Sequence, residues 1–422
     1  MRTIRIPYGR GSQQLHIDEE RLSAVIAPRH LNAVKRDQAA IVEEALQHPI
    51  DSPRLSEVAR GKRRVLLITS DHTRPVPSRI TLPALLAEIR SGNPQAEITI
   101  LVASDMHREM TQEEQLERFG EEIAARERIV VHRAADDGEM AYFGVLPSGG
   151  ELWLNRLATE ADLVVAEGFI EPHFFAGFSG GRKAILPGIA SRRTVLYNHN
   201  ARFIKDPRAR QGILEGNPIH ADMAYAAQQV GLAFILNVLV DGNKRIVEAV
   251  AGDPVLAHRE GCRRCEAACR AEPVVSDIAI TSNGGYPLDQ NLYQSVKGMT
   301  AAERCVRPGG AIILCAALGD GHGGEAFFRW FSERDGPEAV ARDIEGVPPE
   351  KTTPDQWQAQ ILARVMCRAR CWFVTGESDR SLVEDMHMRW APDVDTALAE
   401  ASALLGQQAS VTVIPDGVGV IL

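Results

Sequence analysis

Polar side chains that suit acid–base chemistry and anion binding follow three apolar stretches of the sequence. Asp71, His72 and Arg74 come after residues 63–70, His107 comes after 96–104, and His173 comes after 162–171. An imidazole can accept or return a proton near neutral pH, because its unperturbed pKa is about 6.5. A nearby arginine can hold a carboxylate. One such histidine would be unremarkable, but three neighbouring strand ends with this content favour a catalytic site.

The segment from Glu171 to Lys183, EPHFFAGFSGGRK, is rich in glycine and ends in two basic residues. Its glycines would let backbone N–H groups approach a phosphate, and Arg182 and Lys183 would bring positive charge to the same place. The segment has neither the P-loop spacing nor the GxGxxG pattern. A tight turn with basic residues on the surface is the other interpretation, so the segment alone is weak evidence for a site.

Four further residues are candidates whose sequence context leaves two interpretations open. His199 either binds a divalent metal or is a polar residue at a helix end. Tyr293 and Lys297 lie four residues apart on a predicted helix, so they share a face on which they could grip a carboxylate. The same spacing occurs in short-chain dehydrogenases, but the loop at 70–77 lacks the glycines that a dinucleotide needs. Trp357 is either core packing or a pocket wall.

Strands, loops and helices alternate along the chain, which predicts parallel, doubly wound sheets. The first series contains the three strands above, a helix at 81–92 and a helix that begins at the capping box Thr111-x-x-Glu114. The second series has predicted strands at 276–282, 309–318, 370–376 and 410–417. The predicted fold is α/β, with two domains of mainly parallel, Rossmann-like sheets and an active-site cleft between them.

Length and composition are those of a globular protein with more than one domain. The 422 residues are 45% hydrophobic and 24% charged, and the chain is too long for one ordinary domain. We place the boundary at Ala271-Glu272-Pro273. This predicts an N-terminal cofactor-binding and catalytic α/β domain at 1–271, and a C-terminal α/β domain at 272–422 that contributes substrate-binding residues.

Charge and cysteine content exclude several classes of protein. The net charge of −9 argues against a nucleic-acid partner, which needs a basic face. No run of about 18 apolar residues predicts a membrane span, and the first residues carry charges where a signal peptide is apolar, so we expect a cytoplasmic protein. Cys262, Cys265 and Cys269 have a spacing compatible with a metal site, but it better fits one face of a helix.

Taken together, these segments resemble the nickel-dependent lactate racemase family, which comprises 2-hydroxy acid racemases and epimerases. The matching strings are SDHTRPVP (70–77), DMHREMTQEE (105–114), EPHFFAGFSGGRKAILPGIA (171–190), YNHN (197–200), NLYQSVKG (291–298) and DQWQAQ (355–360). The resemblance implies an isomerase that inverts C2 of a small, lactate-like 2-hydroxy acid. It also implies reversible hydride transfer to a nickel pincer nucleotide, pyridinium-3-thioamide-5-thiocarboxylic acid mononucleotide, which separate biosynthetic enzymes supply.

The resemblance further implies a role for each candidate residue. His107 and His173 are the expected acid/base pair, Lys183 forms the covalent link to the cofactor, and His199 is the nickel ligand. The expected cofactor-binding residues are Gly177, Ser179, Gly180, Gly181, Arg182 and Lys183. The expected substrate-binding residues are Asp71, Arg74, Tyr293, Gln294, Lys297 and Trp357.

Two other classes of function use the same residues. One is a metal-dependent hydro-lyase that acts on a related acid without the pincer. The other is a non-catalytic protein that binds a hydroxy acid or stores the cofactor. The sequence leaves open which 2-hydroxy acid is used and what the oligomeric state is.

Overall fold

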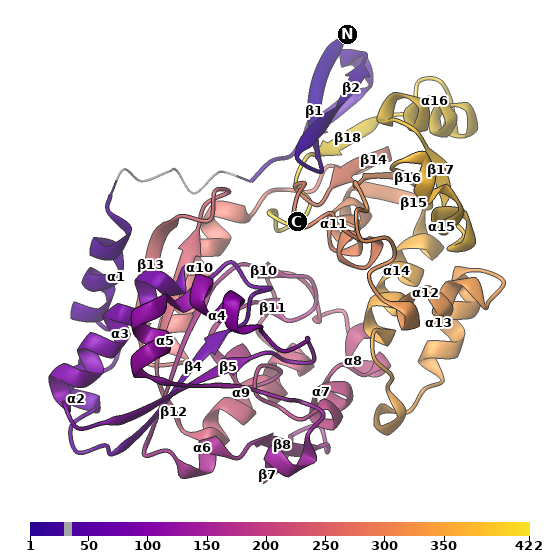
Figure 1. Cartoon of the computed structure of the whole chain (residues 1–422). Coiled ribbons are helices and arrows are strands. Elements are labelled where there is room, and N and C mark those ends of the chain that lie inside the picture. Colours follow the sequence, from indigo (N-terminus) through magenta and orange to yellow (C-terminus); the bar gives the residue numbers. More distant parts are fainter. Residues whose placement is uncertain (29–35) are drawn as a thin grey trace. The chain divides into compact units, whose positions relative to one another are not determined.

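The computed structural model describes residues 1–28 and 36–422, which form two compact units (Figure 1). The central unit comprises described residues 36–198 and 206–268. The terminal unit comprises described residues 1–28, 199–205 and 269–422, and therefore contains both ends of the sequence. Both units are α/β with mainly parallel sheets, which confirms the predicted fold class.

The sheet of the central unit has the strand order β13-β12-β9-β4-β5-β6. Its strands are β4 (Arg64–Ser70), β5 (Glu97–Ala103), β6 (Arg128–Val131), β9 (Leu163–Phe169), β12 (Leu232–Val240) and β13 (Ile246–Gly252). Neighbours are parallel except β13, which runs antiparallel to β12. Successive residues of β4, from Val65 to Ile68, are all buried, as expected for a strand covered on both faces.

Helices and two short hairpins complete the central unit. The helices are α1 (Gln38–Gln47), α2 (Leu55–Val58), α3 (Ser78–Gly92), α4 (Gln112–Phe119), α5 (Glu121–Arg126), α6 (Leu157–Glu160), α7 (Arg192–Asn198), α9 (Pro218–Val230) and α10 (Leu256–Cys269). The hairpins pair β7 (Met140–Val145) with β8 (Glu151–Asn155), and β10 (Pro172–His173) with β11 (Gly177–Phe178). Apolar residues of α1 and α3 form one core with the sheet, and α4 begins at the predicted capping box of Thr111 and Glu114.

The sheet of the terminal unit is parallel throughout, with the order β17-β16-β15-β14-β18-β3. Its strands are β3 (Leu22–Val25), β14 (Ser276–Ser282), β15 (Val306–Cys315), β16 (Arg370–Val374), β17 (Arg389–Ala391) and β18 (Val411–Ile414). Its helices are α8 (Ala201–Lys205), α11 (Leu292–Cys305), α12 (Glu325–Ser332), α13 (Pro337–Glu345), α14 (Gln356–Arg368), α15 (Arg380–Asp385) and α16 (Val394–Leu405). Among the described residues, no helix combines the length and apolar character needed to cross a bilayer.

The structure corrects the predicted N-terminal domain of 1–271 at two segments. The hairpin of β1 (Arg2–Tyr8) and β2 (Gly11–Ile17) buries Ile4, Ile6, Leu15 and Ile17 in the core of the terminal unit, and β3 pairs with β18. Residues 199–205 also belong to the terminal unit. Both segments obtain their contacts from strands and helices far away in sequence, so a boundary drawn along the chain could not capture them.

The position of the β1–β2 hairpin generates a stability prediction. Ile6 is fully buried, so Ile6→Ala should lower the stability of the terminal unit by about 2–5 kcal/mol. In native-state hydrogen exchange, we expect amides of β14 and β18 to lose protection while amides of β4 and β9 keep theirs. Thr3→Ala, on the exposed face of the same strand, is the control. Equal loss of protection in both units would contradict this assignment.

Candidate functional site

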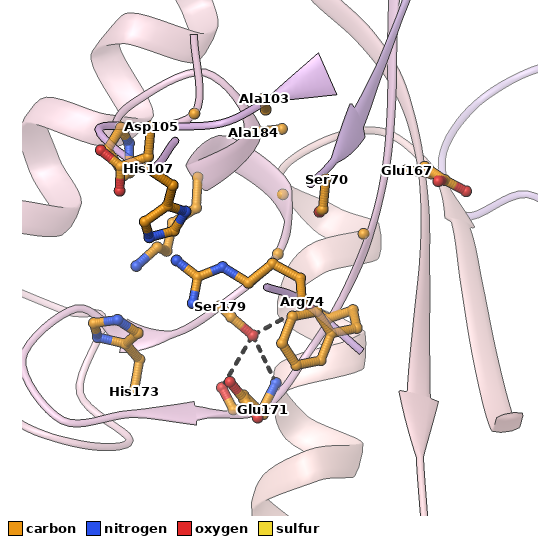
Figure 2. Close-up of a pocket in the computed structure, with 17 residues that line it drawn as sticks. Ser70, Arg74, Ala103, Asp105, His107, Glu167, Glu171, His173, Ser179 and Ala184 are labelled. Atoms are coloured by element: carbon orange, nitrogen blue, oxygen red, sulfur yellow. Dashed lines mark hydrogen bonds between the residues drawn. The ribbon is translucent and has the colours of Figure 1, made fainter. Parts of the chain in front are cut away.

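A pocket in the central unit collects side chains from the loops that follow β4, β5 and β9 (Figure 2). Parallel strands end at the same edge of a sheet, so these three loops converge there. The pocket has a volume of about 620 Å³, including space open to solvent, and its lining includes Arg74, His107, His173 and Lys183. Four predicted site residues, separated by up to about 110 positions in sequence, therefore share one cavity.

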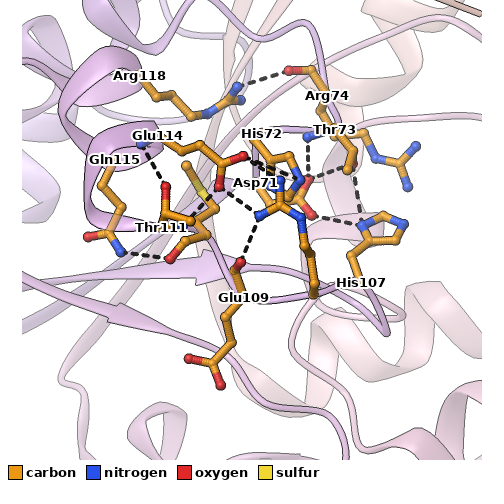
Figure 3. Close-up of polar contacts among 12 residues, drawn as sticks. Asp71, His72, Thr73, Arg74, His107, Glu109, Thr111, Glu114, Gln115 and Arg118 are labelled. Atoms are coloured by element: carbon orange, nitrogen blue, oxygen red, sulfur yellow. Dashed lines mark hydrogen bonds and ion pairs between the residues drawn. The ribbon is translucent and has the colours of Figure 1, made fainter.

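The Asp71 carboxylate orients the His107 ring through a hydrogen bond at Nδ1 (Figure 3). Asp71 Oδ2 lies 2.7 Å from His107 Nδ1, and its other oxygen accepts from the backbone N–H of Thr73 at 3.1 Å and from the Thr73 hydroxyl at 2.6 Å. An aspartate at Nδ1 selects the imidazole tautomer with the proton on that nitrogen, which leaves the Nε2 lone pair available as a base. Asp71, in the loop after β4, thus fixes the orientation and tautomer of His107, in the loop after β5.

Asp71, which was predicted to bind substrate, makes its hydrogen bonds to groups of the protein. Its side chain is only 1% exposed, and both oxygens are engaged by protein groups. Burial raises the pKa of the Asp71 carboxyl, but hydrogen bonds from His107 and Thr73 and the charge of Arg74 outweigh burial, and the net pKa is lowered. Asp71 therefore stays ionised as a partner of His107.

The loop that carries His107 is held to α4 by ionic contacts. Glu114 closes the capping box of α4 and forms a bidentate pair with Arg108. The Arg108 side chain and the Thr111 backbone N–H lower the pKa of Glu114 to about 2, so this carboxylate is ionised at neutral pH. From the same helix, Arg118 Nη1 donates to the backbone carbonyl of Arg74 at 3.0 Å. Helix α4 thus supports both His107 and Arg74.

His173 lies on the β10–β11 hairpin, on the other side of Arg74 from His107 in the view of Figure 2. Its Nδ1 accepts from the backbone N–H of Ala176 at 3.2 Å, so in the neutral ring the proton is on Nε2. The ring packs edge-on against Phe175, with centroids 4.6 Å apart, and Lys183 Nζ lies 5.9 Å from the centroid of Phe175. Phe175 therefore links the predicted second acid/base residue to the predicted cofactor lysine.

The glycine-rich segment is held tightly inside the protein as well as lining the pocket. Gly180 has a φ of +77°, and a Cβ there would lie 2.7 Å from Asn237 Oδ1. The same oxygen accepts from the N–H of Gly181 at 2.8 Å. Only glycine satisfies both the left-handed backbone and the close approach of Asn237. Gly180 and Gly181 therefore determine the backbone conformation of this loop and its contact with Asn237.

Three of the predicted cofactor-binding residues have contacts that the prediction did not include. Ser179 lines the pocket, but its hydroxyl donates to Phe169 O at 3.0 Å and accepts from Glu171 N–H at 2.9 Å. Gly177 lies against the Ile213 carbonyl, outside the lining of this pocket. Arg182 is also absent from the lining and only 4% exposed, so its side chain is buried whereas Lys183 lines the pocket.

Glu167 is a pocket residue that sequence reasoning missed. It lies on β9, is 2% exposed, and accepts hydrogen bonds from the hydroxyls of Thr69, Ser78 and Thr81. Three hydroxyl donors satisfy the buried carboxylate, which fixes the end of β9 to β4 and α3. The available signal was an acidic residue inside an otherwise apolar strand, ADLVVAEGFI.

The remaining predicted site residues belong to the terminal unit. His199 is 5% exposed and packs edge-on against Trp357, with ring centroids 5.0 Å apart. Trp357 Nε1 donates to the Tyr293 hydroxyl at 3.2 Å. Trp357 therefore contacts both His199, the candidate metal ligand, and Tyr293, a candidate substrate-binding residue.

Helices α11 and α14 position this second group. Tyr293, Gln294 and Lys297 lie in the first turns of α11, which Asn291 caps by accepting from the Gln294 N–H at 2.9 Å. Gln360 Nε2, one turn beyond Trp357 on α14, donates to Ala201 O at 2.8 Å and so tethers the segment that follows His199. Gln360 is 7% exposed and was also missed by sequence reasoning. Its contact is one that only the tertiary structure reveals.

The cysteine group of α10 is part of the protein interior. Cys262 and Cys265 are buried, and Cys262 contacts His258 one turn away. Burial raises the pKa of the Cys262 thiol to about 12, so the thiol is protonated at neutral pH. Within residues 1–28 and 36–422, no cluster of three or more histidine, cysteine or acidic side chains is arranged to hold a metal ion.

Comparisons with known proteins match the chain along its whole length. The family model of the lactate racemase N-terminal domain matches residues 8–212, and that of the lactate racemase C-terminal domain matches residues 271–422. Lactate racemase from Thermoanaerobacterium thermosaccharolyticum is 49% identical over 423 residues, covering 100% of this chain and 99% of that protein. Lactate racemase from Lactiplantibacillus plantarum is 47% identical, covering 100% of both chains.

Solved structures show the same relationship. The structure of the lactate racemase apoprotein from T. thermosaccharolyticum superimposes with a TM-score of 0.96 at 50% identity, covering 100% of this chain and 99% of that one. A Thermotoga maritima protein has a TM-score of 0.64 at 17% identity, covering 90% of this chain and 96% of its own, and so shares the fold.

The lowered pKa of Asp71 predicts how stability depends on pH. A carboxyl whose pKa is lower in the folded state stabilises that state above its ordinary pKa, and the contribution is lost as pH falls through the folded pKa. We expect Asp71→Asn to reduce the free energy of unfolding by about 1–3 kcal/mol at neutral pH. In urea unfolding, the difference from wild type should shrink below about pH 4, the ordinary range of aspartate.

Asp18→Asn is the control for this experiment, because Asp18 is exposed and its side chain makes no cap hydrogen bond. A stability difference between wild type and Asp71→Asn that stays constant from neutral to acidic pH would contradict the ionised pair.

Proposed function

Because the chain belongs to the lactate racemase family, we propose that it inverts C2 of a small, lactate-like 2-hydroxy acid with a lysine-tethered nickel pincer nucleotide. The observation that supports this most directly is the shared pocket of Arg74, His107, His173 and Lys183. It brings together an anion-binding group, two imidazoles and an amine, which are the groups the reaction requires.

The residues present are compatible with the proposed cofactor. Lys183 lines the pocket beside Gly180 and Gly181, where an amine can form a covalent link and glycine backbone lets a ligand approach closely. His199, in the terminal unit, offers an imidazole nitrogen, which suits nickel, and the pincer would supply the remaining donors. When bound, the cofactor would supply an acceptor that takes hydride from C2 of the substrate and returns it.

Arg74 and His107 would act on the substrate together. The Arg74 guanidinium can bind the substrate carboxylate and so fix the position of C2. His107 Nε2 can then accept the proton of the C2 hydroxyl, because Asp71 holds the other ring nitrogen. The negative charge of Asp71 would stabilise the imidazolium that forms, as the aspartate of a Ser-His-Asp triad does.

His173 would serve the opposite enantiomer. Removal of hydride leaves a planar 2-keto acid, whose carbonyl can turn from one histidine toward the other while Arg74 keeps the carboxylate. The two imidazoles are held differently: a carboxylate contacts Nδ1 of His107, whereas a backbone N–H contacts Nδ1 of His173. For each enantiomer, the imidazole on its side would accept the hydroxyl proton as C2 is oxidised and return it as C2 is reduced.

The role of Lys183 is tested by mass and activity together. Protein produced in a host that makes the pincer nucleotide should carry the cofactor mass on the tryptic peptide of Lys183 and should racemise a 2-hydroxy acid. Lys183→Ala should lack both. Lys205→Ala, at an exposed lysine of α8, should keep both. Racemisation by Lys183→Ala at the wild-type rate would overturn the proposal, and so would a metal-dependent dehydration in its place.

The two-histidine scheme has a separate test. His107→Gln and His173→Gln should each slow racemisation by about 10²–10⁴-fold with cofactor mass and nickel content retained, because each removes one proton acceptor. In single-turnover experiments started from either pure enantiomer, each variant should oxidise one enantiomer and fail with the other. If both variants fail with the same enantiomer, the assignment of one histidine to each hand is wrong.

A further inference from the structure

Arg182, the residue before Lys183, is a buried cation whose hydrogen-bond partners are all uncharged. Its Nη2 donates to Ala176 O at 2.7 Å, and its Nη1 donates to Gly180 O at 3.2 Å and lies 3.5 Å from Ser179 O. Three carbonyls of the glycine-rich loop therefore converge on one guanidinium. Among residues 1–28 and 36–422, no aspartate or glutamate pairs with it.

One buried imidazole, His258, and one half-buried imidazole, His220, contact the other side of the guanidinium. Arg182 Nε donates to His220 Nδ1 at 3.0 Å, and Arg182 Nη1 lies 3.0 Å from His258 Nε2. The His258 Nε2 also lies 2.8 Å from Ser179 O, and the His258 ring contacts Gly181 so closely that a Cβ there would be 2.8 Å away. His258, from α10, thus touches both the arginine and the loop that the arginine holds.

The charge states of this cluster hold its geometry steady near neutral pH. Burial lowers the pKa of Arg182 to about 10, so the guanidinium remains a cation. Burial and the charge of Arg182 lower the pKa of His220 to about 3, and the same causes keep the pKa of His258 well below its ordinary value. Neither imidazole gains a charge near neutral pH, so their contacts with the Arg182 cation do not change with pH there.

The backbone turn that contains Arg182 also determines the direction in which the Lys183 side chain points. Gly181–Ala184 form a 3-10 turn, in which successive side chains point roughly 120° apart because there are 3.0 residues per turn. With Arg182 held inward, Lys183 emerges at the pocket, which it lines while Arg182 does not. Rotation of the turn would move the amine of Lys183 away from that position.

We propose that Arg182 is the positioning residue for Lys183, and that His258 completes the clamp which fixes the glycine-rich loop around it. The inference rests on the proposed function for the role of Lys183, but the clamp itself acts in the protein before any cofactor is attached. The group that the clamp presents is a primary amine directed at an electrophilic ligand.

The test compares His258→Leu with His258→Gln in the cofactor-free full-length protein. Glutamine offers both an acceptor for Arg182 and a donor for the Ser179 carbonyl, whereas leucine offers neither. The readout is the rate at which an amine-acylating reagent modifies Lys183, measured by peptide mass spectrometry and divided by the rates of Lys205 and Lys351. We expect His258→Leu to lower this ratio by about tenfold, which is the size of loss seen when a residue that orients a ligand group is removed. The ratio for His258→Gln should stay near that of the wild type.

Arg182→Met should shift the ratio in the same way, and Arg263→Met, at an exposed arginine on α10, is its matched control. If Arg182→Met does not fold, the two His258 variants decide the question alone. Thermal unfolding of each variant separates positioning from stability, because a purely structural role would lower the unfolding midpoint and leave the Lys183 ratio unchanged. Folded His258→Leu with a wild-type Lys183 ratio would overturn the proposal.

A second measurement, in a host that makes the cofactor, is the fraction of chains with cofactor mass on Lys183. We expect it to fall in His258→Leu and to be retained in His258→Gln. The acylation rates need no cofactor, so the failure of the proposed function, seen as racemisation by Lys183→Ala, is distinguishable from failure of the clamp.

Discussion

The parallel alignment of β4, β5 and β9 is the constraint on which the pocket depends. Three strands that run in the same direction end at the same edge, so the loops after them meet although they are far apart in sequence. Asp71, His107 and His173 each come from a different one of these loops. Antiparallel pairing of any one strand would send its loop to the opposite edge and separate the groups.

Buried polar groups connect these loop ends to the protein core. Glu167 receives three hydroxyl donors, Asp71 receives His107 and Thr73, and Arg182 donates to three carbonyls. Each group would be costly to bury alone. Glu167 is satisfied by residues far away in sequence, Asp71 by one distant and one neighbouring residue, and Arg182 largely by carbonyls of its own loop. The same contacts that satisfy them restrict the loops, which is how a stable core and an ordered pocket are obtained together.

In the terminal unit, the candidate residues are held by ring packing and neutral hydrogen bonds. Trp357 lies between His199 and Tyr293, and Gln360 ties the chain after His199 to α14. A short segment, residues 199–205, leaves the central part of the sequence to join this unit. The position of His199 is therefore determined largely by α14, which begins at Gln356, 157 residues later in the sequence.

Sequence alone determined the α/β class, the approximate strands, the capping box of α4 and the candidate residues, because these depend on local periodicity and on short motifs. It placed Asp71, Arg74, His107, His173 and Lys183 at strand ends or in loops, which is enough to predict a shared edge. Tertiary structure decided which way each side chain points. Arg182 faces inward and Lys183 lines the pocket because His258 and three loop carbonyls engage the guanidinium, and no local pattern encodes that contact. It also decided that the first strands join the last, since β3 finds its partner in β18 only when the chain is folded.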